Sequence, residues 1–300
     1  MYPDDDQTEV VFVHKLSSGE PNARAKALKL LHQFIKERSQ QKTLTKETFN
    51  RLSKGIHYAM WMQDKPLLQE ELADNMAGIL DDFETHEEGS LFVEVFLNAL
   101  SKEWHLVDRW RLDKFLMFMR RIIKKVFGIM ARHDFDPKIV DIFMKPLNND
   151  VISANGNIVD SLKSHFASFY WTELNKFEPN KTISHRFLDY YLDTLRENRA
   201  KDFYFKSICT EIFETLINEA VYRIRGEEEE PDTVIGEAIK SNALVPLDFD
   251  AVAESLFEIG AQPTINRKRR KILYDLSKQF KAISQGKDPK PRPEDMEDSC

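Results

Sequence analysis

The chain has 300 residues, of which 42% are hydrophobic, so it is long and apolar enough to form a large core. Its formal net charge of −7 at neutral pH argues against bulk binding to nucleic acids, because such binding needs many cations to replace the counterions of phosphates; any RNA contact must therefore be local. No run of about 18 apolar residues occurs and none follows the start, so we expect neither a membrane span nor a signal peptide, and a protein that stays inside the cell.

Glycine and proline are few, with 10 and 12 residues, and apolar side chains recur at helical spacing along most of the chain. This pattern predicts an all-α protein without sheets. Pro146 should end or kink the helix before residues 148–157, which read as a polar turn region. In chain order the expected helices cover residues 9–16, 21–40, 49–62, 66–80, 91–100, 108–132, 137–147, 158–171, 184–199, 203–223, 248–259 and 264–283.

Residues 53–80 predict two helices that meet at a corner. Tyr58, Trp61 and Met62 lie on the side of the first helix opposite its main apolar stripe, so its C-terminal end should be buried between two neighbouring helices. The same three side chains would alternatively form an exposed anchor for a partner, since aromatic residues dominate interface hot spots. Asp64 is expected to cap the second helix, with Pro66 in its first turn.

Successive helices joined by short links predict an irregular, HEAT-like α-solenoid of antiparallel helical hairpins, because the signature residues of tetratricopeptide and ankyrin repeats are absent. A compact helical bundle is the alternative fold. We expect residues 1–284 to form a single elongated helical-repeat domain, with residues 148–157 as the candidate internal break. The acidic residues 226–232 should form a solvated loop and residues 285–300 a disordered tail.

The sequence contains no recognisable catalytic or metal-binding motif. Its eight histidines never occur at the i, i+4 spacing of a helical zinc site, and there is no Walker loop, nucleophile elbow or glycine-rich dinucleotide turn. Cys209 and Cys300 alone do not indicate a metal knuckle or a disulfide framework. We therefore predict a protein that is not an enzyme, with no catalytic residues, metal, cofactor or small-molecule substrate.

Two segments carry a local excess of positive charge. Residues 107–134 contain eight Lys and Arg against three Asp, and residues 267–290 contain nine Lys and Arg against two Asp. In the first segment four cations follow one another at steps of 7, 4 and 7, so they share one helix face that could bind RNA phosphates or a partner: Lys114, Arg121, Lys125 and Arg132. The second begins with five cations that resemble a nuclear localisation patch or a phosphate-binding site: Arg267, Lys268, Arg269, Arg270 and Lys271. A merely solvated helix face is the alternative for both.

Two blocks of the sequence are distinctive. The first comprises Lys54, Gly55, Tyr58, Met60, Trp61, Met62, Asp64, Lys65, Pro66, Gln69, Glu70, Glu71 and Leu72. The second is residues 104–121, WHLVDRWRLDKFLMFMRR. In this order the two blocks resemble the nucleolar ribosomal RNA processing protein 1 family (Nop52-like), and the resemblance covers residues 10–205. Neither block is a catalytic motif, and we expect the residues of the first to be mainly structural.

This resemblance implies a non-catalytic scaffold or assembly factor in the nucleus and nucleolus. The role it implies is ribosomal RNA processing and biogenesis of the large (60S) ribosomal subunit, and the implied partners are the proteins and RNA of the large-subunit precursor particle. Composition and periodicity by themselves indicate only a helical-repeat binding protein. The alternative of a different class is a cytoplasmic adaptor or regulatory subunit that binds acidic peptides, and an unrecognised hydrolase is a further one.

Overall fold

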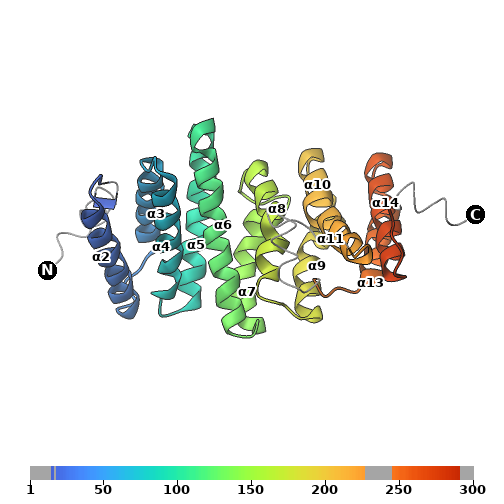
Figure 1. Ribbon diagram of the computed structural model, residues 1–300, viewed down its shortest axis with the longest axis horizontal. Helices are drawn as coiled ribbons and strands as arrows, with labels where there is room; N and C mark the ends of the chain where they lie inside the picture. The colour runs from blue at the N-terminus through green and yellow to red at the C-terminus, as the bar shows by residue number, and fades with distance from the viewer. Residues whose placement is uncertain (1–14, 17, 227–244, 291–300) are drawn as a thin grey trace, which may run out of the picture. The chain divides into compact units, whose positions relative to one another are not determined.

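The computed structural model describes residues 15–16, 18–226 and 245–290, and within these ranges the protein consists of helices and connecting turns with no strand (Figure 1). The all-α prediction is confirmed. Most of the predicted first helix, the acidic loop beyond Gly226 and the predicted tail beyond Lys290 lie outside the described residues. The chain divides into two compact units: unit 1 is Met1–Val151 with Asn157–Leu162, and unit 2 is Ile152–Gly156 with Lys163–Cys300. The single elongated domain remains a prediction.

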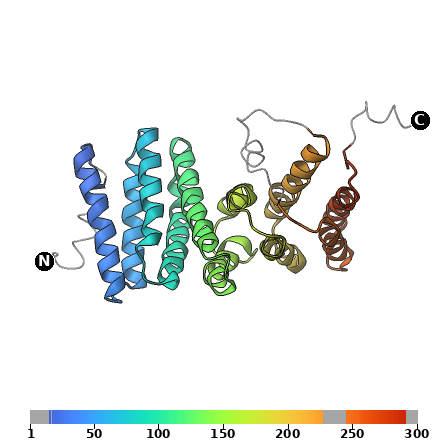
Figure 2. The same cartoon turned by 60° about the horizontal axis from the view of Figure 1, so that its bottom comes forward.

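Unit 1 is built from helices that stack in two rows. α3 packs against α5 and α5 against α7 in one row, while α4 packs against α6 in the other. Packing of α3 on α4 and of α6 on α7 joins the rows as helical hairpins, which is the local pattern of an α-solenoid (Figure 2). The elements are α2 (Pro21–Gln40), α3 (Lys46–Trp61), α4 (Pro66–Gly78), the 3-10 turn η1 (Ile79–Asp81), α5 (His86–Glu103), the 3-10 turn η2 (Trp104–Leu106), α6 (Arg109–Arg132) and α7 (Pro137–Leu147).

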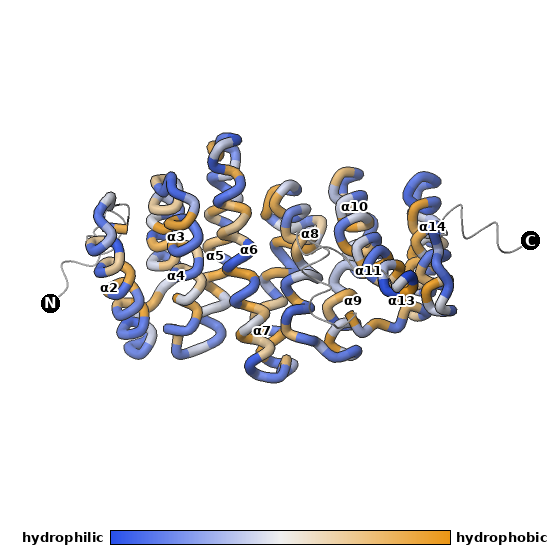
Figure 3. The backbone as a smooth tube through the Cα atoms, in the orientation of Figure 1, coloured by the Kyte–Doolittle hydropathy of each residue, from blue (hydrophilic) through white to orange (hydrophobic). Residues whose placement is uncertain are grey.

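Each of these helices places an apolar stripe against its neighbours and polar residues in water, so that hydrophobic and hydrophilic residues alternate along the tube in Figure 3. In α3 the stripe that the sequence predicts, which includes Phe49 and Ile56, is buried. Side chains also fix where helices begin. Thr45, Thr85 and Asp108 each accept a hydrogen bond from a backbone N–H in the first turn of α3, α5 and α6.

Pro146 lies inside α7, which runs on into the π-helical turn η3 (Asn148–Ile152). The predicted polar turn region therefore begins with helix, and its Ile152 is fully buried. Proline has no N–H for the carbonyl four residues earlier, which belongs to Ile142. Ser90 of α5 donates its hydroxyl to that carbonyl instead, at 2.7 Å. A hydrogen bond between α5 and α7 thus replaces the one that proline removes.

Unit 2 is also helical. α13 and α14 form its closest pair; α14 packs on α11 and η4, and α13 on α9. Ile152 joins this unit through its carbonyl, which accepts a hydrogen bond from the Tyr204 hydroxyl at 2.8 Å. The elements are α8 (Asp160–Asn175), which begins in unit 1, α9 (Lys181–Glu197), α10 (Asp202–Ile208), the π-helical turn η4 (Cys209–Glu214), α11 (Thr215–Ile224), α13 (Phe249–Ala261) and α14 (Arg267–Ser284).

The first part of the predicted disordered tail is held in place. The guanidinium of Arg225, just after α11, donates from Nε to a carboxylate oxygen of Asp288 at 2.6 Å and from a terminal nitrogen to the carbonyl of Lys290. Asp288 and Lys290, at the start of the predicted tail, thus have a partner in a cation that lies beyond the end of another helix, and the disordered tail remains a prediction.

We expect Ser90→Ala to lower the free energy of unfolding by about 1 kcal/mol, because it removes the donor that the carbonyl of Ile142 uses in place of a backbone N–H. Pro146→Ala restores that N–H, so Ser90→Ala should cost less in the Pro146→Ala background. Chemical denaturation of the four proteins of this double-mutant cycle measures the coupling. An equal cost of Ser90→Ala in both backgrounds would show that Ser90 does not replace the missing donor.

Candidate partner-binding surfaces

Arg121, in the predicted cationic row of α6, faces the acidic side of α4. Its guanidinium forms ion pairs with Glu70 and Asp74, at N–O distances of 3.5 and 3.4 Å. These two acids lie four residues apart on α4 and so share one helix face. The row therefore runs alongside carboxylates that a neighbouring helix supplies.

Asp81 of η1 continues this acidic side and contacts the next two cations of the row. It accepts hydrogen bonds from Lys125 and, at 2.6 Å, from Arg132. Burial alone would raise the pKa of Asp81, but these hydrogen bonds and the two positive charges hold the pKa below its usual value. The carboxylate is ionised at neutral pH, so its negative charge opposes the positive charges of Lys125 and Arg132.

Lys114, the first residue of the predicted row, points into the protein. Its side chain is only 5% exposed, and its amine donates to the carbonyls of Trp61 at 2.8 Å and Gln63 at 2.7 Å. Burial lowers the pKa of this amine. Lys114 could contact a phosphate only by breaking its hydrogen bonds to two carbonyls at the end of α3. The structure therefore gives Lys114 a structural role, in place of the predicted position on a binding face.

The two distinctive sequence blocks meet at this corner. Besides the bonds of Lys114, the guanidinium of Arg111 lies 4.6 Å from the centroid of the Trp61 ring, a cation–π contact. The ring of His57 stacks on Phe115 with centroids 4.5 Å apart. The end of α3 and the first turns of α6 therefore form one packed group, which gives a physical reason for both blocks.

The corner differs from the sequence prediction in two respects. Tyr58 is 46% exposed and Met62 49%, while Trp61 is half-buried, so the end of α3 is not enclosed between two helices. Asp64 is not the cap of α4; that position is Lys65, whose side chain makes no capping hydrogen bond, with Pro66 next as expected. Lys65, Glu70 and Glu71 are exposed.

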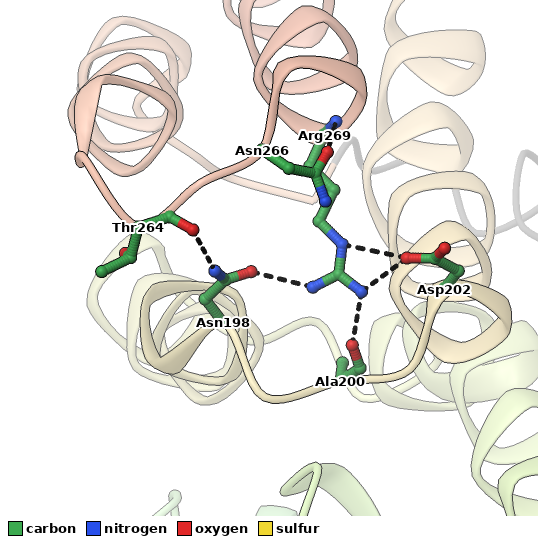
Figure 4. A network of polar contacts seen from close by, with 6 residues as sticks. All are labelled: Asn198, Ala200, Asp202, Thr264, Asn266 and Arg269. Atoms are coloured by element: carbon green, nitrogen blue, oxygen red, sulfur yellow. Dashed lines mark hydrogen bonds and ion pairs between the residues drawn. The ribbon is translucent and has the colours of Figure 1, made fainter.

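Arg269, in the predicted localisation cluster, is a buried structural residue of α14 (Figure 4). Its guanidinium donates to Asn198 at 2.8 Å, to the carbonyl of Ala200 at 2.6 Å and to Asp202 at 2.7 and 3.2 Å. It also lies 4.7 Å from the centroid of the Phe205 ring. The link between α9 and α10 is closed by these contacts, so Arg269 is not available to a receptor or a phosphate.

Arg270 is also engaged within unit 2. It donates to the carbonyls of Gly260, Gln262 and Ile265, at 2.9, 3.0 and 3.1 Å. These carbonyls lie at the end of α13 and in the turn that follows, where helix geometry leaves acceptors without donors. Of the five predicted cations, the exposed ones are Arg267, Lys268 and Lys271.

Two features are absent from the described part of the chain. No three of its His, Cys, Asp or Glu side chains are grouped so that they could hold a metal ion. Among its helices, none has both the length and the apolar character that crossing a bilayer needs.

A family model for the nucleolar protein Nop52 matches residues 7–276. The chain belongs to the Nop52 family. Relatives named ribosomal RNA processing protein 1 homologues support this: one from Caenorhabditis elegans is 39% identical over 283 residues, which are 94% of this chain and 69% of that protein. Human homologues B and A are 24% and 25% identical over 95% and 93% of this chain. The chain spans 44% of human homologue B and 71% of homologue A.

The Nop52 match includes both blocks at the corner of α3 and α6. We expect Lys114→Met to lower the free energy of unfolding by about 2–4 kcal/mol, because two carbonyls lose a charged donor. The matched control is Lys124→Met on the same helix, whose side chain makes no hydrogen bond or ion pair with the described residues. Urea denaturation compares the variants. Equal stability of both would refute the structural role of Lys114.

Proposed function

We propose that this chain is a non-catalytic scaffold in ribosomal RNA processing, acting in the nucleolus on precursors of the large ribosomal subunit. The observation that carries the proposal is the Nop52 match over residues 7–276, which extends from α2 into α14 and so includes helices of both units. The names of the relatives, ribosomal RNA processing protein 1 homologues, supply the process.

The surfaces of the described residues favour protein partners over an extended RNA contact. The cationic row on α6 is compensated by Glu70, Asp74 and Asp81, and Lys114 is buried. Large hydrophobic side chains are in contrast exposed, and residues of that kind commonly anchor protein interfaces. In this proposal the chain holds assembly proteins of the precursor particle, and RNA contact is confined to the few exposed cations.

Depleting the protein from cells should cause precursors of the large-subunit RNAs to accumulate and the amount of large subunit to fall. Northern hybridisation with probes for each precursor and sucrose-gradient profiles measure these changes. Re-expression of this chain is the control, and it should also sediment with large-subunit precursor particles. Normal amounts of every large-subunit precursor after depletion would overturn the proposal.

We expect the three exposed cations of α14 to direct nuclear import. Replacing Arg267, Lys268 and Lys271 with Ala should reduce nuclear accumulation of a fluorescent fusion without unfolding it, because these side chains are exposed. The matched control removes three cations further along: Lys278, Lys281 and Lys287. Microscopy gives the nuclear-to-cytoplasmic ratio. If both triple variants accumulate in the nucleus like the parent, the three cations form only a solvated face.

A further inference from the structure

A groove with a volume of 410 Å³ opens on unit 1 between α3, α5 and η2. One wall presents Lys54, Tyr58 and Trp61 of α3. The other presents Ala99 and Lys102 of α5 and Leu106 of η2. Within each wall the residues are three or four positions apart, so each wall is one face of a helix, extended in the second case by its 3-10 turn. The groove therefore runs between two helical walls.

The groove exposes large hydrophobic side chains. Tyr58 is 46% and Leu106 56% exposed. Large apolar side chains gathered at one exposed place mark an interaction site more often than chance exposure does.

An aromatic side chain, His57, also lines the groove. Its ring stacks on the buried Phe115. Burial lowers the pKa of His57, against an opposing effect of the nearby negative charge of Glu103. The imidazole is therefore neutral at pH 7, and it offers an apolar ring face instead of a charge.

Each wall carries one exposed lysine that has no ion-pair partner in the part of the chain that the structure describes. For Lys54 on α3 and Lys102 on α5, no ion pair is found among the described residues. The two amines flank a largely apolar groove, so the complementary ligand has an apolar centre and carboxylates at both edges. A phosphate backbone fits less well, because it carries negative charge along its whole length and would place that charge against Glu103 and the apolar centre, whereas a helix presents carboxylates only at the two lysines.

We propose that this groove binds an amphipathic helix of another protein, with large apolar residues at i, i+3 or i+4, and i+7, and acidic residues along both edges of that stripe. The α3 wall extends from Asn50 to Trp61, about 16 Å at 1.5 Å per residue, which matches three turns of helix. A helix laid between two helices packs by ridges into grooves and continues the stacking of the unit. The inference rests on the proposed scaffold function, since it takes the helix to belong to a protein of the precursor particle.

The test uses the full chain and a displayed library of 16-residue helical peptides. Stripe positions vary among Leu, Ile, Met and Phe, and edge positions among Glu, Gln and Lys. We expect wild-type chain to enrich peptides with Glu at both edges, and the best of these, synthesised with a fluorophore, to bind at least about tenfold more weakly to Leu106→Glu by anisotropy. Leu67→Glu is the matched control, because Leu67 is 81% exposed on α4 outside the groove.

A charge exchange tests the edges of the groove. Lys54→Glu combined with Lys102→Glu should reverse the preference, so that the same peptide with Lys edges binds more tightly than the one with Glu edges. Circular dichroism melting confirms that the variants fold. Selection without a preference for Glu edges, equal binding to Leu106→Glu and Leu67→Glu, or no reversal in the double variant would each overturn the inference.

Two further arms identify other occupants. Displacement of the labelled peptide by a 12-nucleotide oligouridine would make the groove an RNA site, and loss of self-association in Leu106→Glu by sedimentation would make the occupant a second copy of this chain. Both results would overturn the inference. The peptide assay contains no ribosomal particle, so a negative result there contradicts the groove inference and not the scaffold proposal. Normal amounts of RNA precursors after depletion would instead contradict the scaffold proposal, without bearing on whether the groove binds a helix.

Discussion

Backbone carbonyls at helix ends and in the turns between helices lack a donor within the helix, so the folded chain must supply donors to those that are removed from water. In this protein long cationic side chains supply many of them. Lys114 donates to carbonyls at the end of α3, and Lys163 donates to three carbonyls within residues 153–156. Arg269 donates to a carbonyl in the link between α9 and α10, and Arg270 donates to carbonyls at the end of α13 and in the turn after it. Each of these contacts fixes a turn against a helix, so the packing of both units depends on them as well as on apolar stripes.

This use of cations changes what the charge distribution means. The positive excess of residues 107–134 and 267–290 is partly engaged inside the fold, and the α6 row is opposed by carboxylates of α4 and η1. Arginine suits this role because its guanidinium donates in several directions at once, as Arg269 does to three residues. An acidic chain can therefore contain strongly basic segments without presenting an extended surface for nucleic acid.

The corner between α3 and α6 has a structural role and adjoins the groove for which we propose binding. Lys114 donates a hydrogen bond to the carbonyl of Trp61, and the guanidinium of Arg111 lies over its ring. Trp61 in turn lines the groove together with Lys54 and Tyr58 of the same helix. In the proposed binding mode this wall is held before the ligand arrives, and such preorganisation lowers the entropic cost of association. A scaffold assembled from stacked helices benefits from such a site, since the partner's helix extends the same packing that holds the unit together.

The sequence by itself determined the all-α class, most helix positions and the Nop52 family, because helical periodicity, sparse glycine and two motif blocks are local properties of the chain. It also placed Arg121, Lys125 and Arg132 correctly on one face of one helix. Only the tertiary structure decided that Lys114, Arg269 and Arg270 are engaged within the protein while Tyr58 and Met62 remain exposed. The physical reason is that the availability of a side chain depends on what the neighbouring helix places opposite it, and residues such as Glu70 and Asp81 come from distant positions that no single-helix pattern contains.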